Sequence, residues 1–119
     1  DFYDRLMEGS GGEEERKQLM LGKGRLHKRK RNFEEAVHLW EDALTCRGFS
    51  AEPYEELAKV YEHHLADLHK ARNYTERALE QVSLMQQLHP ERVREQLKEN
   101  LMVRLRRLQR KLRRGKETV

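Results

Sequence analysis

Four side chains that could bind a metal ion lie close together near the middle of the chain. They are His63, His64, Asp67 and His69. On a helix, His64 and Asp67 would lie one turn apart, a spacing that a divalent metal can use. His63 and His64 instead project about 100° apart, His69 lies beyond a predicted turn, and no His-Glu-x-x-His spacing is present. We therefore expect solvated or partly packed side chains here, and the sequence predicts no metal site and no cofactor.

Paired acids raise the question of general acid–base catalysis. The pairs Glu34-Glu35 and Glu55-Glu56 fall on helix faces that are predicted to be exposed, with no nucleophile nearby. Such catalysis requires a carboxylate positioned beside a reacting group. No Gly-rich phosphate loop follows a predicted strand, and Gly22 and Gly24 are better explained as small helix-packing residues. The sequence therefore predicts no catalytic residue and no enzyme activity in this chain.

Basic residues form two blocks that could contact phosphate groups. Six Lys or Arg residues and no acid fall between Lys23 and Arg31, and eight with no acid fall between Arg104 and Lys116. A phosphate backbone would bind such blocks by counterion release, without sequence being read. The alternative is a solvated helix, because cations are favoured near helix C-termini. The candidate phosphate contacts are Lys30, Arg31, Arg106, Arg107, Arg110 and Arg113.

The composition indicates one modest domain of thin, amphipathic helices, since 36% of the 119 residues are hydrophobic and 39% are charged. A single cysteine, Cys46, excludes an intramolecular disulfide and a cysteine-based zinc site, and it favours a reducing compartment. No apolar run is long enough to span a bilayer, and no signal peptide is visible. We therefore expect a cytoplasmic location. The chain begins at Asp1 rather than Met, which indicates a fragment of a longer protein.

The apolar periodicity predicts five helices, whose ends are marked by capping residues, glycine and proline. The first runs from Glu13 to about Arg31. The second follows Asn32, which with Glu35 forms a capping-box-like signal, and Gly48 is expected at its C′ position. Four aromatic residues fall on apolar helix faces, so we expect core packing rather than stacking on nucleic-acid bases. They are Trp40, Tyr54, Tyr61 and Tyr74.

The later helices are bounded in the same way. Ser50 or Glu52 caps the third helix, and Pro53 lies in its first turn. The fourth starts near residue 67 and reaches about residue 88, where His89-Pro90 breaks it. A last long helix follows, with a narrow leucine seam that fits a bundle or a coiled coil. The seam consists of Val93, Leu97, Leu101, Leu105, Leu108 and Leu112.

Two segments of the chain repeat at an offset of 35 residues. The matched pairs are Phe33 and Leu68, Ala36 and Ala71, Ala43 and Ala78, and Leu44 and Leu79. A period in the mid-thirties with small residues at set positions indicates helical-hairpin repeats, because alanines let paired helices approach closely. We therefore expect an all-α fold: a linker or docking segment over residues 1–12, two hairpins over 13–89, a long basic capping helix over 90–115, and a tail over 116–119.

The repeated positions resemble the tetratricopeptide repeat (TPR). The second copy matches through Tyr54, Leu57, Ala58, Tyr61, Leu68, Ala71, Ala78 and Leu79. The first copy departs from the pattern, because Met20, Lys23 and His27 replace the usual Trp-like, Leu and Tyr residues. The resemblance implies an α-solenoid fragment whose groove is lined by the first helix of each hairpin. The exposed groove positions would be Leu21, Arg25, Lys28, Arg29, Glu55, Glu56, Lys59, Glu62 and His63.

A narrower resemblance covers three stretches of the second half. Residues 53–63, residues 70–79 and the leucine- and arginine-rich helix at 104–114 are similar to the C-terminal region of certain bacterial proteins. Those proteins carry an RNase H-like exonuclease domain ahead of a short TPR-like tail. The resemblance implies that this chain is an accessory, nuclease-associated part, and that the catalytic carboxylates lie upstream of it.

These observations favour a non-catalytic protein–protein interaction module that serves a larger protein. Each helical hairpin needs a neighbour to cover its apolar face, so two repeats leave one face for a protein partner or an upstream domain of the same chain. The alternatives are a nucleic-acid-binding appendage of an attached nuclease domain, which would use the two basic blocks, and a homodimer formed through residues 97–112. No membrane partner is expected.

Overall fold

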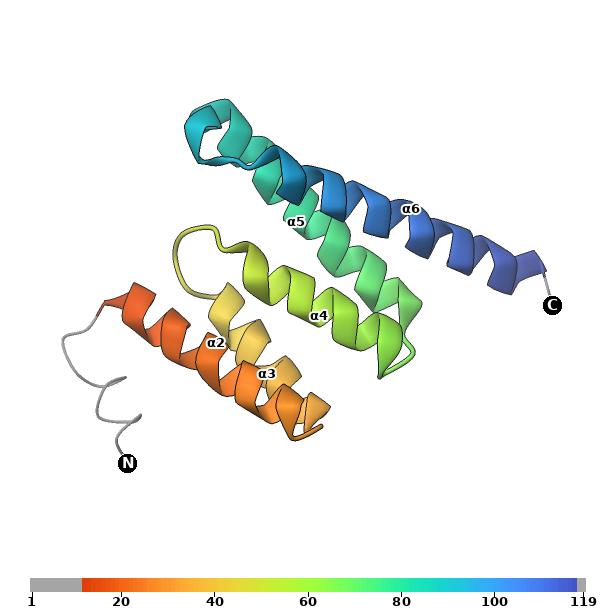
Figure 1. Ribbon diagram of the computed structural model, residues 1–119, viewed down its shortest axis with the longest axis horizontal. Coiled ribbons are helices and arrows are strands. Elements are labelled where there is room, and N and C mark those ends of the chain that lie inside the picture. Colours follow the sequence, from red (N-terminus) through yellow and green to blue (C-terminus); the bar gives the residue numbers. More distant parts are fainter. Residues whose placement is uncertain (1–11, 118–119) are drawn as a thin grey trace. The chain divides into compact units, whose positions relative to one another are not determined.

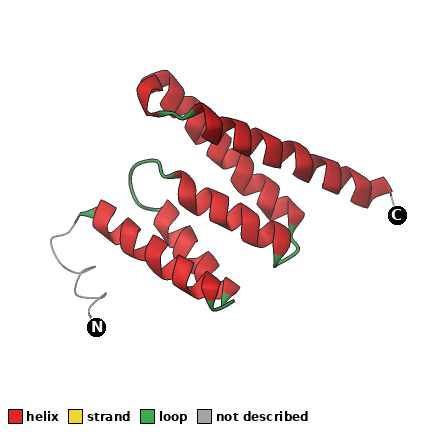
Figure 2. Ribbon diagram, in the orientation of Figure 1, coloured by secondary structure: helices red, strands yellow, loops and turns green. Residues whose placement is uncertain are grey.

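The computed structural model describes residues 12–117, and within that range every regular element is a helix (Figures 1 and 2). The elements are α2 (Glu13–Arg29), α3 (Phe33–Leu44), α4 (Ala51–His63), α5 (Leu68–Leu88), a short 3₁₀ turn η1 (Pro90–Arg92), and α6 (Glu95–Glu117). The all-α prediction is therefore confirmed. Apart from Gly12, the predicted docking segment over residues 1–12 lies outside the described residues, as do the last two positions of the predicted tail.

The chain divides into two compact units, and the boundary between them in the sequence falls between Pro53 and Tyr54. The first unit holds the α2–α3 hairpin and the start of α4, and the second holds the rest of α4 together with α5, η1 and α6. None of the helices in the described part of the chain combines the length and the apolar character needed to cross a membrane.

The capping residues behave differently at the starts of α3 and α5. Asp67 is the N-cap of α5, and its carboxylate accepts a hydrogen bond of 3.1 Å from the backbone N–H of Lys70. Asn32 occupies the N-cap position of α3, but its side chain makes no capping hydrogen bond, so the capping-box prediction is wrong in this respect. The chain turns into α3 through Arg31, whose backbone adopts a positive φ of 63°.

Two boundaries differ from the sequence prediction. Helix α3 ends at Leu44 with Thr45 as its C-cap, so Gly48 is not the C′ residue; it supplies a φ of 82° later in the connecting loop. Helix α6 begins at Glu95 rather than directly after the His89-Pro90 break, because η1 and the extended residue Val93 intervene. It continues to Glu117 and therefore includes two positions of the predicted tail.

The core of the first unit is built around Trp40, whose side chain is fully buried. Gly24 lies against the indole ring, and a Cβ at this position would overlap it. The prediction that Gly24 is a packing residue is confirmed, whereas Gly22 is exposed and has no neighbour that a Cβ would meet. Lys17 is also buried, and its ammonium group donates a 3.1 Å hydrogen bond to the carbonyl of Arg47, which attaches α2 to the loop after α3.

The core of the second unit combines residues from all three of its long helices. Its fully buried apolar side chains include Leu57 and Val60 of α4, Ala78 and Val82 of α5, and Leu101 and Leu108 of α6. Tyr61 of α4 stacks on Tyr74 of α5, with ring centroids 5.8 Å apart and planes at 9°. Two members of the leucine seam are thus buried, and α6 packs against the unit along this line. Burial of one leucine side chain contributes roughly 1.5–3 kcal/mol.

Candidate functional site

A cluster of charged side chains joins α4 to α6. Glu62 of α4 has a side chain that is 0% exposed, and three cations from α6 converge on it. Arg107 donates from Nε to Oε2 at 2.9 Å and from Nη2 to Oε1 at 2.8 Å. Arg104 Nη1 donates to Oε1 at 2.9 Å, and Lys111 Nζ donates to Oε2 at 2.7 Å. We call these four residues the Glu62 cluster.

The cluster keeps Glu62 ionised. Hydrogen bonds from Arg107 are the largest influence on the carboxyl group; burial opposes them, and Lys111 adds to them, so that the pKa of Glu62 is lowered to about 2. The same contact raises the pKa of Arg107 above its ordinary value. Charge-assisted hydrogen bonds of this kind are about twice as strong as neutral ones. At neutral pH Glu62 therefore stays ionised, and its ion pairs attach α6 to α4; the carboxyl group does not serve in proton transfer.

Two residues predicted to be exposed in the groove are buried. Glu62 lies beneath the α6 cations, and Leu21 of α2 is only 2% exposed, so both predictions of exposure are wrong. The sequence predicts that the last helix covers the bundle with its leucine seam and offers Arg106, Arg107, Arg110 and Arg113 as phosphate contacts, and it gives Arg107 no acidic partner. Arg104, Arg107 and Lys111 lie at steps of three and four residues beside the leucine seam, but Arg106, Arg110 and Arg113 have the same kind of spacing, so no sequence signal singles out the cations that meet Glu62.

The other predicted groove residues divide between the two units. Those of the first unit are Arg25, Lys28 and Arg29, and those of the second are Glu55, Glu56, Lys59 and His63. Arg25 pairs with Glu52 at 2.7 Å, and Lys59 pairs with Glu56 at 3.4 Å. Glu55 and Lys59 line a hollow of about 370 Å³ together with residues of α6. The combined groove stays a prediction, because its two walls belong to different units.

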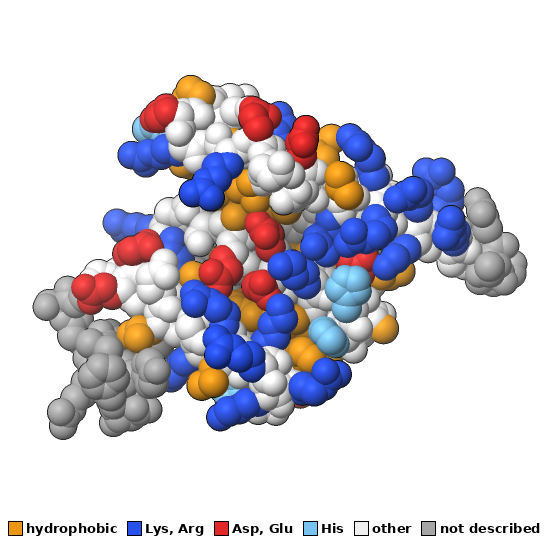
Figure 3. Space-filling model, viewed as in Figure 1, with side chains coloured by type: hydrophobic (Ala, Val, Ile, Leu, Met, Phe, Trp, Pro, Cys, Tyr) orange, Lys and Arg blue, Asp and Glu red, His pale blue; other side chains and the backbone are white. Residues whose placement is uncertain are grey.

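The predicted phosphate contacts do not form one set. Lys30 and Arg31 are exposed just after α2 in the first unit, where the Arg31 guanidinium lies over the ring of Phe33 at 5.4 Å from its centroid. The other four belong to α6 in the second unit, and Lys and Arg side chains gather visibly over its C-terminal half (Figure 3). Of those four, Arg107 is engaged by Glu62, whereas Arg106, Arg110 and Arg113 are exposed.

A second hollow, of about 670 Å³, lies between α5 and α6, and we call it the leucine hollow. It is lined by Glu76, Leu79, Glu80, Ser83, Leu84, Gln87, Leu105 and Gln109. Leu84 is 49% exposed, and Leu88, four residues further along α5, is 62% exposed. The sequence analysis missed this hollow; the apolar residue Leu84, which lies off the inward face of α5, was the available signal.

The histidines and the aspartate that raised the question of a metal site do not come together to form one. His63, His64 and His69 are exposed, and Asp67 is occupied as the N-cap of α5. The imidazole of His63 lies 3.6 Å from a carboxylate oxygen of Glu62. Among the residues that the structure describes, no three His, Cys, Asp or Glu side chains are arranged so that they could hold a metal ion. Cys46 is buried, as a small core residue should be.

Comparisons of this chain with protein-family models, with curated proteins and with solved structures find no match. The resemblances to the TPR and to nuclease-associated tails therefore rest on the sequence positions that carry them. In the structure, α2 and α3 form a hairpin in the first unit. In the second unit, α4 and α5 are neighbours, and the stacked rings of Tyr61 and Tyr74 join them.

Proposed function

We propose that this chain is a non-catalytic, TPR-like protein-interaction module, and that the leucine hollow receives an amphipathic helix of a protein partner. The observation that carries the proposal is the exposure of Leu84, which lines the hollow together with Leu79 and Leu105. Exposed apolar groups rimmed by polar ones are typical of protein interaction sites. Burial of the exposed half of Leu84 alone would contribute about 1 kcal/mol to binding.

The rim of the hollow defines the chemistry of the partner helix. On the α5 side it carries Glu76 and Glu80, and Glu80 is exposed with no ion pair among the described residues. Gln87 and Gln109 supply neutral hydrogen-bonding groups. Glu76 already pairs with Arg72 at 3.3 Å. A helix that places leucines at i, i+3 and i+7, with Lys or Arg beside them, would bury its apolar face and pair with Glu80. Helical-repeat proteins bury their hairpin faces against neighbouring helices in the same manner.

The first step of the test places a photo-crosslinking amino acid at position 84, which should capture the partner. In the second step, the affinity of the chain for the purified partner is measured. Leu84→Ser should weaken its affinity about tenfold, since the apolar contact is lost and a hydroxyl is buried. Leu26→Ser is the matched control, because Leu26 is 45% exposed, similar to Leu84, and lies in the first unit. Equal affinity of the native chain and Leu84→Ser for the purified partner would refute the proposed site.

A further inference from the structure

Three arginines form a row along the exposed side of α6. Arg106, Arg110 and Arg113 follow one another at steps of four and three residues, so they share one face of the helix. The steps correspond to axial rises of about 6 Å and 4.5 Å. All three side chains are exposed. We call these residues the arginine row.

The row differs from Arg104, Arg107 and Lys111 of the same helix in having no acid to neutralise it. Arg104, Arg107 and Lys111 all bind Glu62. The side chains of the arginine row, in contrast, make no ion pair or hydrogen bond with any other residue that the structure describes, and the sequence holds no acid between residues 100 and 116. Three unpaired guanidinium groups on neighbouring turns repel one another. A bound polyanion would remove this repulsion.

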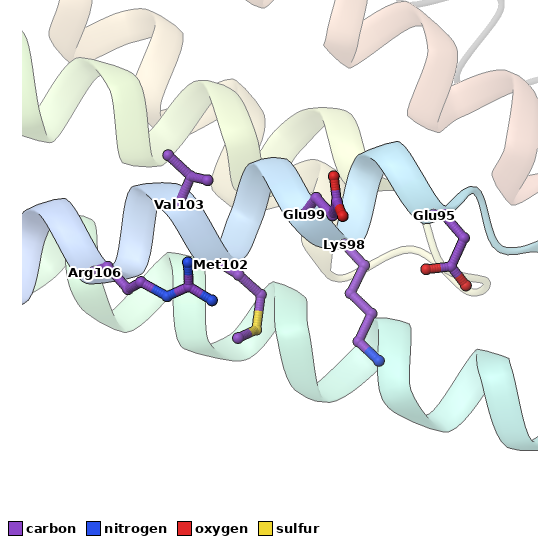
Figure 4. A pocket seen from close by; sticks show the side chains of 6 residues that line it. All are labelled: Glu95, Lys98, Glu99, Met102, Val103 and Arg106. Carbon is purple, nitrogen blue, oxygen red and sulfur yellow. The ribbon is translucent and has the colours of Figure 1, made fainter.

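The row also borders a shallow, open hollow on the surface of α6. Its three arginines, with Val103 and Gln109, line a shallow hollow of about 450 Å³. Arg106 and Val103 also line a neighbouring hollow of about 440 Å³, whose lining includes the two acids Glu95 and Glu99. In that second hollow Lys98, Met102 and Arg106 project from the same side of α6 (Figure 4). The arginine row itself, from position 106 to position 113, is about 10 Å long.

We propose that the arginine row binds the phosphate backbone of a nucleic acid. Guanidinium groups match phosphate oxygens in a planar, bidentate geometry, and three of them in a line suit a ligand with regularly repeated phosphates. Contacts to phosphate oxygens carry no sequence information, so binding is independent of base sequence. An anionic membrane fits less well, because the apolar face of α6, including Leu101 and Leu108, is buried in the core and has nothing large to insert.

The number of contacts fixes the expected salt dependence. Three phosphate contacts give a slope of log affinity against log salt of about −2.7 for duplex DNA and about −2.1 for a single strand. Between 50 and 200 mM salt, affinity should therefore fall about 20- to 40-fold. This interaction goes beyond the proposed protein docking, and it uses residues other than the leucines of the hollow.

The experiment is a fluorescence-anisotropy titration of labelled 20-nucleotide single- and double-stranded DNA with the whole chain at 50, 100 and 200 mM salt. The test variant replaces Arg106, Arg110 and Arg113 with Gln, which retains helix propensity. The control variant replaces Lys70, Arg92 and Arg94, three other exposed cations of the second unit, with Gln. Circular dichroism of both variants verifies their helix content. We expect the test variant to lose the salt-dependent binding and the control variant to retain most of it.

Three results would overturn the proposal: no binding of the native chain at 50 mM salt, equal losses in both variants, or displacement of DNA by poly-glutamate of equal charge. The last would indicate an acidic protein as the ligand. Row-dependent binding to phosphatidylserine vesicles without binding to DNA would assign the surface to a membrane instead. Leu84→Ser should keep its DNA affinity, so failure of the docking proposal and failure of this one can be told apart.

Discussion

Replacement of Glu62 with Gln should destabilise the second unit by about 3 kcal/mol. The substitution keeps the size of the side chain but removes the charge on which Arg104, Arg107 and Lys111 converge. A pKa lowered from 4.5 to about 2 corresponds to between 3 and 4 kcal/mol. Because the three cations are partly exposed and screened by water, the lower end of this range applies. Urea unfolding at pH 7, followed by far-UV circular dichroism, measures the loss. Glu55→Gln is the control, with an expected change below about 0.5 kcal/mol.

The pH dependence provides an independent check on the same cluster. Glu62 has a lower pKa in the folded chain than in the unfolded one, so its contribution is complete above about pH 4.5 and is lost as the pH falls through about 2. The stability difference between the native chain and Glu62→Gln should therefore shrink over that interval. A native chain no more stable than the variant at pH 7, or a difference that persists unchanged at pH 2, would refute the reasoning.

Two further matched pairs test the packing and the capping. Gly24→Ala should destabilise the first unit by about 2 kcal/mol because the added methyl group overlaps Trp40, as measured by tryptophan fluorescence during unfolding. Gly22→Ala, at an open site, should instead be neutral or stabilise by up to about 1 kcal/mol. Asp67→Ala should cost about 1 kcal/mol through loss of the α5 cap, whereas Asn32→Ala, which removes no capping hydrogen bond, should change stability little. Similar effects from both members of either pair would contradict the structure.

The helices could be predicted because their signals are local. Apolar periodicity and the His89-Pro90 break located α5 to within a residue, and the small residue Gly24 anticipated the close approach of Trp40. The start of α6 was placed too early, because no sequence rule distinguishes a 3₁₀ turn followed by an extended residue from the first turn of a long helix.

The candidate site could be predicted only in part. The sequence identified the basic residues of α6, but not which of them are neutralised. That depends on the register in which α6 packs against α4, and a shift of one residue would turn a different set of cations towards Glu62. The same holds for Lys17, whose burial depends on backbone carbonyls 30 positions away. Long-range partners of this kind leave no periodic trace in a single chain.

The Glu62 cluster contains one acid and three bases. Substitutions on the two sides of the junction between α4 and α6 therefore differ in their cost to stability. Loss of Arg104 or Lys111 leaves the carboxylate with its bidentate contact to Arg107. Loss of the single acid leaves three positive charges without their carboxylate partner. Substitutions should therefore accumulate one at a time on the α6 side of the junction, while position 62 tolerates almost none. Among proteins that share this junction, an unvarying acid opposite an arginine at position 107, with variable bases at positions 104 and 111, would be its signature.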